Sequence, residues 1–162
     1  NIRNTGSIYQ CAVERTNLGH DTIANSIVGV HPEIHNYTKP SQTVKALSLI
    51  VNRLVQKEYV PSTSIVIVSD TPYENSILAG ENRIGAYNLV FKHYKDVGKD
   101  EICFKTAEEF KGLESNVVIY LTHEFANLPS STIDNRKEYV AITRARYYLY
   151  VLNTKCKAAI GD

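Results

Sequence analysis

The chain has 162 residues, with 18 Lys plus Arg set against 17 Asp plus Glu. That length suits one domain, and a hydrophobic content of 43% is enough to bury a core. A net charge of +1 gives no overall attraction for nucleic acid or for an anionic membrane, so such binding needs locally placed charge. No apolar run approaches the roughly 20 residues that cross a bilayer, so no membrane-spanning segment is expected.

The cysteines bear on the cellular compartment, and the absence of methionine bears on whether the sequence is part of a longer protein. Cys11, Cys103 and Cys156 are far apart and show no CxxC spacing, which argues against a disulfide framework or a zinc cluster. We therefore predict an intracellular, cytoplasmic protein. The sequence begins at Asn1 and contains no Met. We favour a segment of a longer protein over a sequence from which methionines are missing.

The first part of the chain predicts two helices. Thr5 is placed to cap the first helix, whose apolar face repeats at i, i+3, i+4 and i+7 through Ile8, Cys11, Ala12 and Arg15. Residues 26–30 could form a strand. The clearest helix runs from about Ser41 to Tyr59 between Pro40 and Pro61, with an apolar stripe of Val44, Leu47, Ile50, Val51, Leu54 and Val55.

The middle of the chain predicts a buried strand. Ile65–Val68 is a continuous β-branched run, which is typical of a strand covered on both faces of a parallel sheet. A turn follows at residues 69–72, and a short helix is expected over Glu74–Ala79. Residues 81–99 give no clear pattern, so we assign no element there.

The last part of the chain alternates strands and a helix. Strands are predicted at Glu101–Thr106, Val117–Leu121 and Tyr147–Leu152, with a helix from an Asp134 cap to Ala145. This alternation predicts a single α/β domain over residues 1–162 with a mostly parallel sheet. Ligands of such sheets bind at the carboxyl ends of the strands. We expect Thr106–Glu114 and the helix after Leu121 to lie there.

Several kinds of catalytic site are poorly supported. The only Gly-Lys pair, Gly98-Lys99, is followed by Asp100, and His93 stands where a phosphate-binding GxxxxGK[ST] loop needs its first Gly. No GxSxG occurs, and Pro32 between His31 and His35 disfavours a helical metal site. The chain alone therefore lacks the usual means of holding the β- and γ-phosphates of a nucleotide with Mg²⁺.

Two segments carry the most informative chemistry. In Thr106–Glu114, Gly112 allows close backbone approach, and the Glu114 carboxylate can accept hydrogen bonds from ribose hydroxyls. In Tyr139–Arg146, Arg144 and Arg146 lie near the end of a predicted helix. The simpler interpretation of these arginines is favourable charge at a helix C-terminus. Each segment alone is more often structural than functional.

Together the two segments resemble the C-terminal RecA-like, three-layer domain of superfamily 1 helicases of the UvrD/Rep type. Phe110–Glu114 followed by Val117-Val118-Ile119 is similar to motif V of that family, and Tyr139–Arg146 followed by a Tyr/Leu-rich strand is similar to motif VI. The opening Asn1–Thr5 is similar to motif IV. The motifs occur in the family's order and frame nearly the whole chain. Motif VI is the most specific of the three.

The resemblance implies a site shared between two domains. ATP binds between the RecA-like domains of these motors, and the first domain supplies the P-loop and the Mg²⁺ ligands. By position, Arg144 would be the arginine finger on the γ-phosphate and Arg3 a second contact to it. Glu114 would bind the ribose, and Gly112, Lys111 and Ile2 would also lie at the nucleotide.

The resemblance also implies partners. They are the N-terminal RecA-like domain of the same protein and single-stranded or partly duplex DNA, with RNA remaining open. Thr106 and Glu108 occupy the nucleic-acid-binding positions of motif V. The full-length protein would then be an ATP-dependent helicase or translocase, and this segment alone would be inactive.

The chain departs from the family's pattern at two positions. Motif IV commonly has a Tyr that stacks on adenine, whereas this chain has Ile2. Motif V commonly reads Thr-x-His, whereas this chain has Thr106-Ala107-Glu108, and a carboxylate repels phosphate. Two alternatives to a motor domain therefore stay open. One is a non-catalytic helicase-derived module that binds protein or nucleic acid. The other, the least favoured, is an independent nucleotide-binding α/β enzyme.

Overall fold

The computed structural model of the chain describes residues 6–16, 31–125 and 135–156. Seven strands form one sheet in the order β1-β7-β6-β2-β5-β4-β3. Every neighbouring pair is parallel except β3 and β4, which are antiparallel. The strands are β1 (Glu33–Tyr37), β2 (Ile65–Ser69), β3 (Arg83–Ile84), β4 (Tyr87–Val90), β5 (Glu101–Thr106), β6 (Ser115–Phe125) and β7 (Ala145–Cys156). The α/β fold with a mostly parallel sheet is therefore confirmed.

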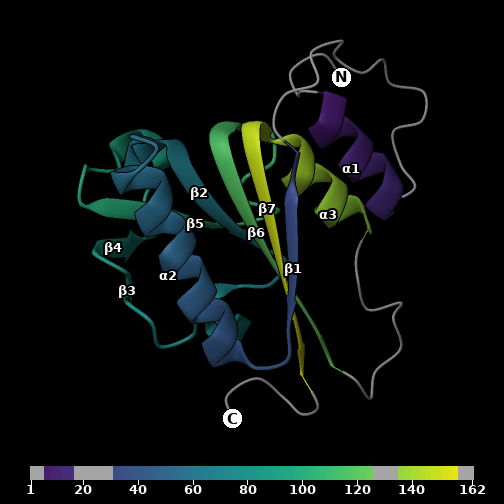
Figure 1. The fold of residues 1–162 in the computed structure, drawn as a ribbon, viewed down its shortest axis with the longest axis horizontal. Helices are drawn as coiled ribbons and strands as arrows, with labels where there is room; N and C mark the ends of the chain where they lie inside the picture. The colour runs from purple at the N-terminus through teal and green to yellow at the C-terminus, as the bar shows by residue number, and fades with distance from the viewer. Residues whose placement is uncertain (1–5, 17–30, 126–134, 157–162) are drawn as a thin grey trace.

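Helices cover both faces of this sheet. Figure 1 shows α2 (Pro40–Gln56) on one side, with α1 (Gly6–Thr16) and α3 (Asn135–Thr143) together on the other. Short 3-10 helices lie at η1 (Ser62–Ser64), η2 (Tyr73–Asn75) and η3 (Tyr94–Asp96). Within the described parts of the chain, no helix combines the length and the apolar character that crossing a bilayer requires.

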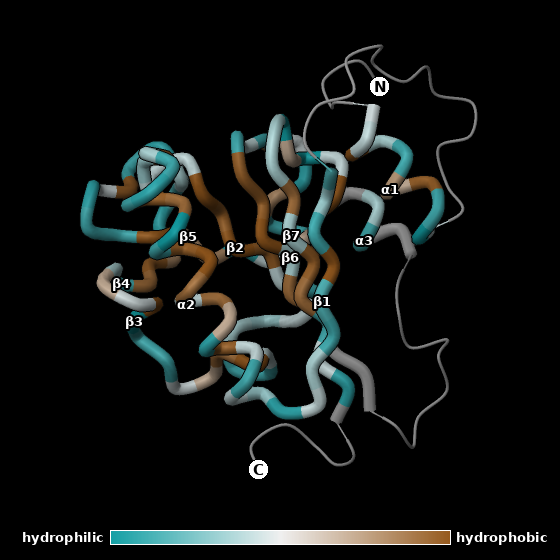
Figure 2. The backbone as a smooth tube through the Cα atoms, viewed as in Figure 1, coloured by the Kyte–Doolittle hydropathy of each residue, from teal (hydrophilic) through white to brown (hydrophobic). Residues whose placement is uncertain are grey.

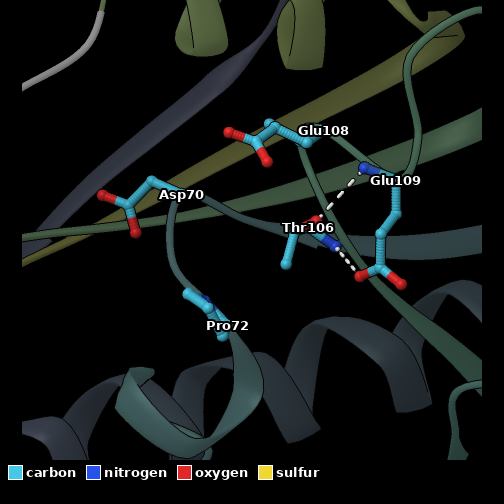
Figure 3. Close-up of a pocket in the computed structure, with 6 residues that line it drawn as sticks. Asp70, Pro72, Thr106, Glu108 and Glu109 are labelled. Atoms are coloured by element: carbon cyan, nitrogen blue, oxygen red, sulfur yellow. Dashed lines mark hydrogen bonds between the residues drawn. The ribbon is translucent and has the colours of Figure 1, made fainter.

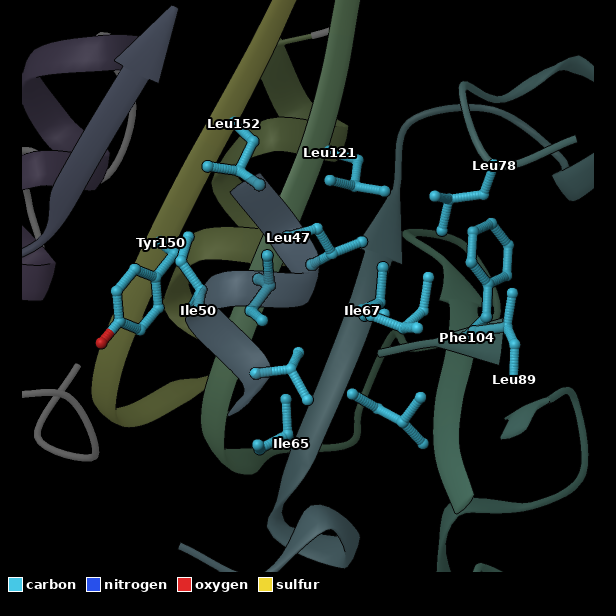
Figure 4. Close-up of a cluster of buried hydrophobic side chains, with 14 of the residues drawn as sticks. Leu47, Ile50, Ile65, Ile67, Leu78, Leu89, Phe104, Leu121, Tyr150 and Leu152 are labelled. Carbon is cyan, nitrogen blue, oxygen red and sulfur yellow. The ribbon is translucent and has the colours of Figure 1, made fainter. Parts of the chain in front are cut away.

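The strand β2 lies at the centre of the core, as its sequence predicts. Ile65, Val66, Ile67 and Val68 are each at most 1% exposed. Ile65 and Ile67 pack toward α2, whereas Val66 and Val68 pack on the opposite face. Figure 2 shows hydrophobic colour along the central strands, and Figure 4 shows the α2 side chains Leu47 and Ile50 meeting β2. A continuous apolar run is needed here because both faces are covered.

The helix α2 follows its predicted stripe but ends three residues early. Leu47, Ile50, Val51 and Leu54 are buried, and Pro40 occupies its first turn. The predicted end was Tyr59, but Tyr59 has φ of +57°, which no helical residue adopts. The N–H of Val60 donates to the Leu54 carbonyl across this reversal, which closes the helix end.

The helix predicted over Glu74–Ala79 is wrong. The chain forms only η2 and then a turn. The Ser76 hydroxyl donates to the Tyr73 carbonyl at 2.8 Å and accepts from the Leu78 N–H at 3.1 Å. These side-chain hydrogen bonds replace those that a helix would make with its own backbone.

The remaining predicted elements are confirmed with shifted ends. The strand over Glu101–Thr106 has the predicted bounds, whereas β6 and β7 extend beyond their predicted spans. The first helix exists as α1 and buries Ile8, Cys11 and Ala12. The last is α3, which ends at Thr143. Thr5, Asp134 and the strand predicted at residues 26–30 lie outside the described residues.

Candidate functional site

The two segments singled out by sequence meet at the amino ends of β6 and β7. Glu114 directly precedes β6, and Arg144 directly precedes β7. The backbone N–H of Ser115 donates to the Arg144 carbonyl at 3.0 Å. Parallel pairing of the two strands begins there, with Ser115 opposite Ala145. One backbone hydrogen bond therefore joins the end of the first segment to the end of the second.

The side chains at this amino edge form a mixed charged group. The Glu114 carboxylate is 3.8 Å from Nε of Arg146, and both side chains reach solvent, at 35% and 47% exposure. The Arg146 guanidinium lies 5.7 Å from the ring centre of Tyr147, which is itself 50% exposed. Arg144 is partly buried beside them. A carboxylate that accepts hydrogen bonds and guanidinium groups that donate them suit the hydroxyls and phosphates of a nucleotide.

The approach to Glu114 contains a turn that glycine makes possible. Gly112 has φ of +82°, in the left-handed region that L side chains rarely adopt. A Cβ built there meets no atom within 4 Å, so the space beside it is open. Lys111 is exposed next to it, whereas the preceding Phe110 is fully buried. Phe110 therefore anchors the turn while Lys111 and Gly112 face solvent.

A cavity of about 440 Å³ opens at the opposite edge of the sheet, where β2 and β5 end. Figure 3 shows it between the chain after β2 and the chain after β5. Its lining is Asp70, Pro72, Thr106, Ala107, Glu108 and Glu109. Three of these six residues are carboxylates, so the cavity favours cations and disfavours phosphate.

Hydrogen bonds order both sides of this cavity. The Thr106 N–H donates to the Glu109 carboxylate at 3.0 Å, and the Glu109 N–H donates to the Thr106 hydroxyl at 3.2 Å. This reciprocal pair has the pattern of a capping box. On the other side, the Thr122 hydroxyl donates to the Asp70 carboxylate at 3.0 Å. Thr106 is thus held in place by its own loop.

The expectation that both segments lie at the carboxyl ends of the strands is half correct. Thr106 and Glu108 do lie there, beside Asp70. Glu114 and Arg144 lie at the amino edge instead, because the chain between two parallel strands must return to that edge before the next strand begins. The structure therefore separates Glu114 and Arg144 from Thr106 and Glu108. Lys111 and Gly112 lie between them in the turn that follows β5, where the Lys111 N–H donates to the Glu108 carbonyl. Arg3 and Ile2 lie outside the described residues.

Sequence reasoning missed Asp70 as a cavity residue. The available signal was its place directly after the buried strand β2, at the edge where ligands of parallel sheets bind. Among residues 6–16, 31–125 and 135–156, no group of three or more His, Cys, Asp or Glu side chains could hold a metal ion.

Comparison with known proteins shows a likeness of fold. No protein-family model matches the chain, and no curated protein sequence matches it either. Among solved structures it is similar to the C-terminal domain of a possible DNA helicase from Lactobacillus plantarum WCFS1, with a TM-score of 0.62. The two are 13% identical, and the match covers 99% of this chain and 95% of the other. The chain therefore shares its α/β fold with that domain over nearly its full length.

Proposed function

We propose that the chain is the second motor domain of an ATP-dependent, UvrD/Rep-like superfamily 1 DNA helicase or translocase. The observation that carries the proposal is the hydrogen bond between Ser115 and Arg144. It joins two residues that are 29 positions apart in sequence, at the ends of the two segments that resemble motifs V and VI. The shared fold with a helicase C-terminal domain supports the same conclusion.

The residues at the amino edge fit a nucleotide. The open space beside Gly112 admits a ligand close to the backbone. Glu114 would accept hydrogen bonds from the ribose, and Arg144 would donate to the γ-phosphate. Lys111, three residues before Glu114 in the sequence, is exposed. Arg3 and Ile2 are proposed for the same site from their positions in the motif IV-like segment. When bound, ATP with Mg²⁺ would supply the phosphoryl group, and a first RecA-like domain would supply the P-loop and the Mg²⁺ ligands.

Arg144 would act by stabilising charge. Phosphoryl transfer spreads negative charge over the γ-phosphate oxygens, and a guanidinium matches them with paired N–H donors. An arginine finger of this kind is worth on the order of 10³ to 10⁵ in rate. Because it comes from a separate domain, hydrolysis would depend on closure of the cleft between the two domains.

The carboxyl edge is the proposed nucleic-acid site of this domain. Thr106 lies at the end of β5, where its hydroxyl would donate to a nucleic-acid phosphate while its N–H stays bonded to the Glu109 carboxylate. Asp70, Glu108 and Glu109 surround it, so contact here would use hydroxyl and backbone groups rather than cations. The same carboxylates favour a second candidate function, a non-catalytic module derived from a helicase, because they weaken phosphate binding.

ATP hydrolysis by the longer protein tests the proposal. The Arg144→Ala variant would be compared with the native protein, with and without single-stranded DNA. A matched control is Arg83→Ala, which removes an exposed arginine of the edge strand β3. We expect DNA to stimulate turnover and Arg144→Ala to lower it about 10³-fold or more, while Arg83→Ala leaves it unchanged.

Two results would contradict the motor proposal. One is a parent protein that hydrolyses no ATP, and the other is an Arg144→Ala variant with native turnover. Either would favour the non-catalytic module. The isolated segment is expected to bind ATP weakly and to hydrolyse none, so clear turnover by the pure 162-residue chain would also contradict a site shared between two domains.

A further inference from the structure

A partly buried ion pair links α1 to α3. Nε of Arg15 lies 2.5 Å from the Glu138 carboxylate. The Glu138 side chain is only 3% exposed and that of Arg15 is 26% exposed. Figure 1 shows the two helices side by side on the same face of the sheet. The Glu138 carboxylate is therefore removed from water, and its charge is balanced by Arg15, which is 123 positions away in sequence.

The surroundings of the pair are apolar. Arg15 shares its helix face with Ile8, Cys11 and Ala12, and Glu138 shares its face with Ala141 and Ile142; all five apolar residues are buried in one cluster. Burial raises the pKa of the Cys11 thiol to about 11, with Arg15 opposing the rise and Glu138 adding to it. Both charges thus act on the interior between the helices.

Such a pair fixes geometry more than it adds stability. Removing two charges from water costs about as much as their attraction returns, so apolar residues of similar size often replace a buried pair without loss of stability. Apolar contacts are not directional, so apolar side chains alone would allow several positions of α3 on α1. A guanidinium bonded to a carboxylate selects one register of α3 on α1.

The pair lies close in sequence to the arginine that the proposed function assigns to the γ-phosphate. Arg144 directly follows α3 and comes six residues after Glu138, about 9 Å along a helix axis. The register of α3 on α1 therefore sets where Arg144 leaves the helix.

We infer that Arg15 and Glu138 are positioning residues, whose ion pair places Arg144 for catalysis. This inference rests on the proposed function, because it needs Arg144 to act on a nucleotide. The residues touch no substrate, and their effect passes through the orientation of α3. A misplacement of about 1 Å in a catalytic group can lower a rate about 10²-fold.

The test uses the longer protein with single-stranded DNA and measures kcat, KM for ATP and melting temperature. The main variant is the double substitution Arg15→Met with Glu138→Leu, which replaces the pair with apolar side chains of similar size. We expect its melting temperature to stay at or above the native value. Its kcat should fall about 10- to 100-fold, with KM changed by less than about threefold.

A conservative variant serves as the rescue. In Glu138→Gln the side-chain carbonyl can still accept a hydrogen bond from Arg15, so the hydrogen bond between the two helices is kept while the negative charge is removed. We expect it to keep most of the native kcat. A purely structural role predicts the opposite order, because Glu138→Gln would leave an uncompensated arginine while the apolar double variant would be fully active.

The outcomes separate this inference from the proposed function. Arg144→Ala is measured alongside. If it abolishes turnover while the apolar double variant keeps native kcat, the positioning role is wrong and the motor function stands. A double variant that melts well below the native protein also overturns the inference, because the pair would then be needed simply to fold. If Arg144→Ala has native turnover, the proposed function fails and the positioning role fails with it.

Discussion

Replacing Gly112 with Ala isolates the backbone conformation of the turn before Glu114. The φ of Gly112 is +82°, and a Cβ there would meet no atom within 4 Å. Gly80 offers a matched control, since its φ is +87° and its surroundings are equally open. It lies between η2 and β3, away from the amino edge. The two substitutions therefore impose the same strain at two places, only one of which belongs to the candidate site.

The expected loss of stability follows from the backbone alone. An L-residue in the left-handed region costs about 1–2 kcal/mol. No steric clash adds to that cost at either position. Ala also restricts the unfolded chain, which offsets the cost by about 0.4–1 kcal/mol. Each variant should lose about 1 kcal/mol of unfolding free energy, or about 2–4 °C in melting temperature for a chain of this size.

Urea unfolding of the native chain, both single variants and the double variant provides the measurement. We expect equal losses that add in the double variant, because the sites share no contacts. In the two-domain motor of the proposed function, Gly112→Ala should raise KM for ATP, whereas Gly80→Ala should not. A loss at Gly112 above about 3 kcal/mol would show that the space is occupied, and no loss at all would show that the turn is not left-handed; either result refutes the reasoning.

Two other predictions concern side-chain hydrogen bonds. The Thr43 and Thr154 hydroxyls are 2.6 Å apart and fully buried, so Thr43→Val should cost about 1–3 kcal/mol in urea unfolding, and the double Val variant less than the sum of the singles. Lys92, with help from the Gly98 N–H, lowers the pKa of Glu101. Its folded pKa is below its unfolded value, so it stabilises the fold above that unfolded value and loses this effect as pH falls through the lowered pKa. In an NMR titration, Lys92→Met should raise the Glu101 pKa; an unchanged midpoint would contradict the assignment.

The elements that sequence predicted best are those set by local pattern. The β-branched run of β2 and the apolar stripe of α2 each predict which of their residues are buried, and the structure confirms both predictions. Residues 81–99 could not be assigned because β3 and β4 have only two and four residues. Their pairing depends on the turn at Gly85, with φ of +58°, and on the neighbouring β5. Tertiary contacts rather than propensity make these strands.

The candidate site was only partly predictable for a similar reason. The motif-like sequences identified Glu114 and Arg144 but did not show which edge of the sheet these residues occupy. That follows from strand direction, which becomes known only when β5 and β6 are both seen to run parallel to β2. Glu138 could have been noticed as a charge on the apolar face of α3, but its partner Arg15 is set by the packing of two distant helices.

The length of the connection from β5 to β6 restricts the conformation that it can adopt. It contains eight residues, 107–114, whereas a crossover between parallel strands usually needs a dozen or more. It must return across about 17 Å, the length of β5, yet eight helical residues would rise only about 12 Å and eight extended ones about 26 Å. Only a tight turn followed by a short extended stretch has the right length. Lengthening or shortening it by one residue would move Glu114 relative to Arg144. The number of residues in this connection therefore sets the distance between these two side chains.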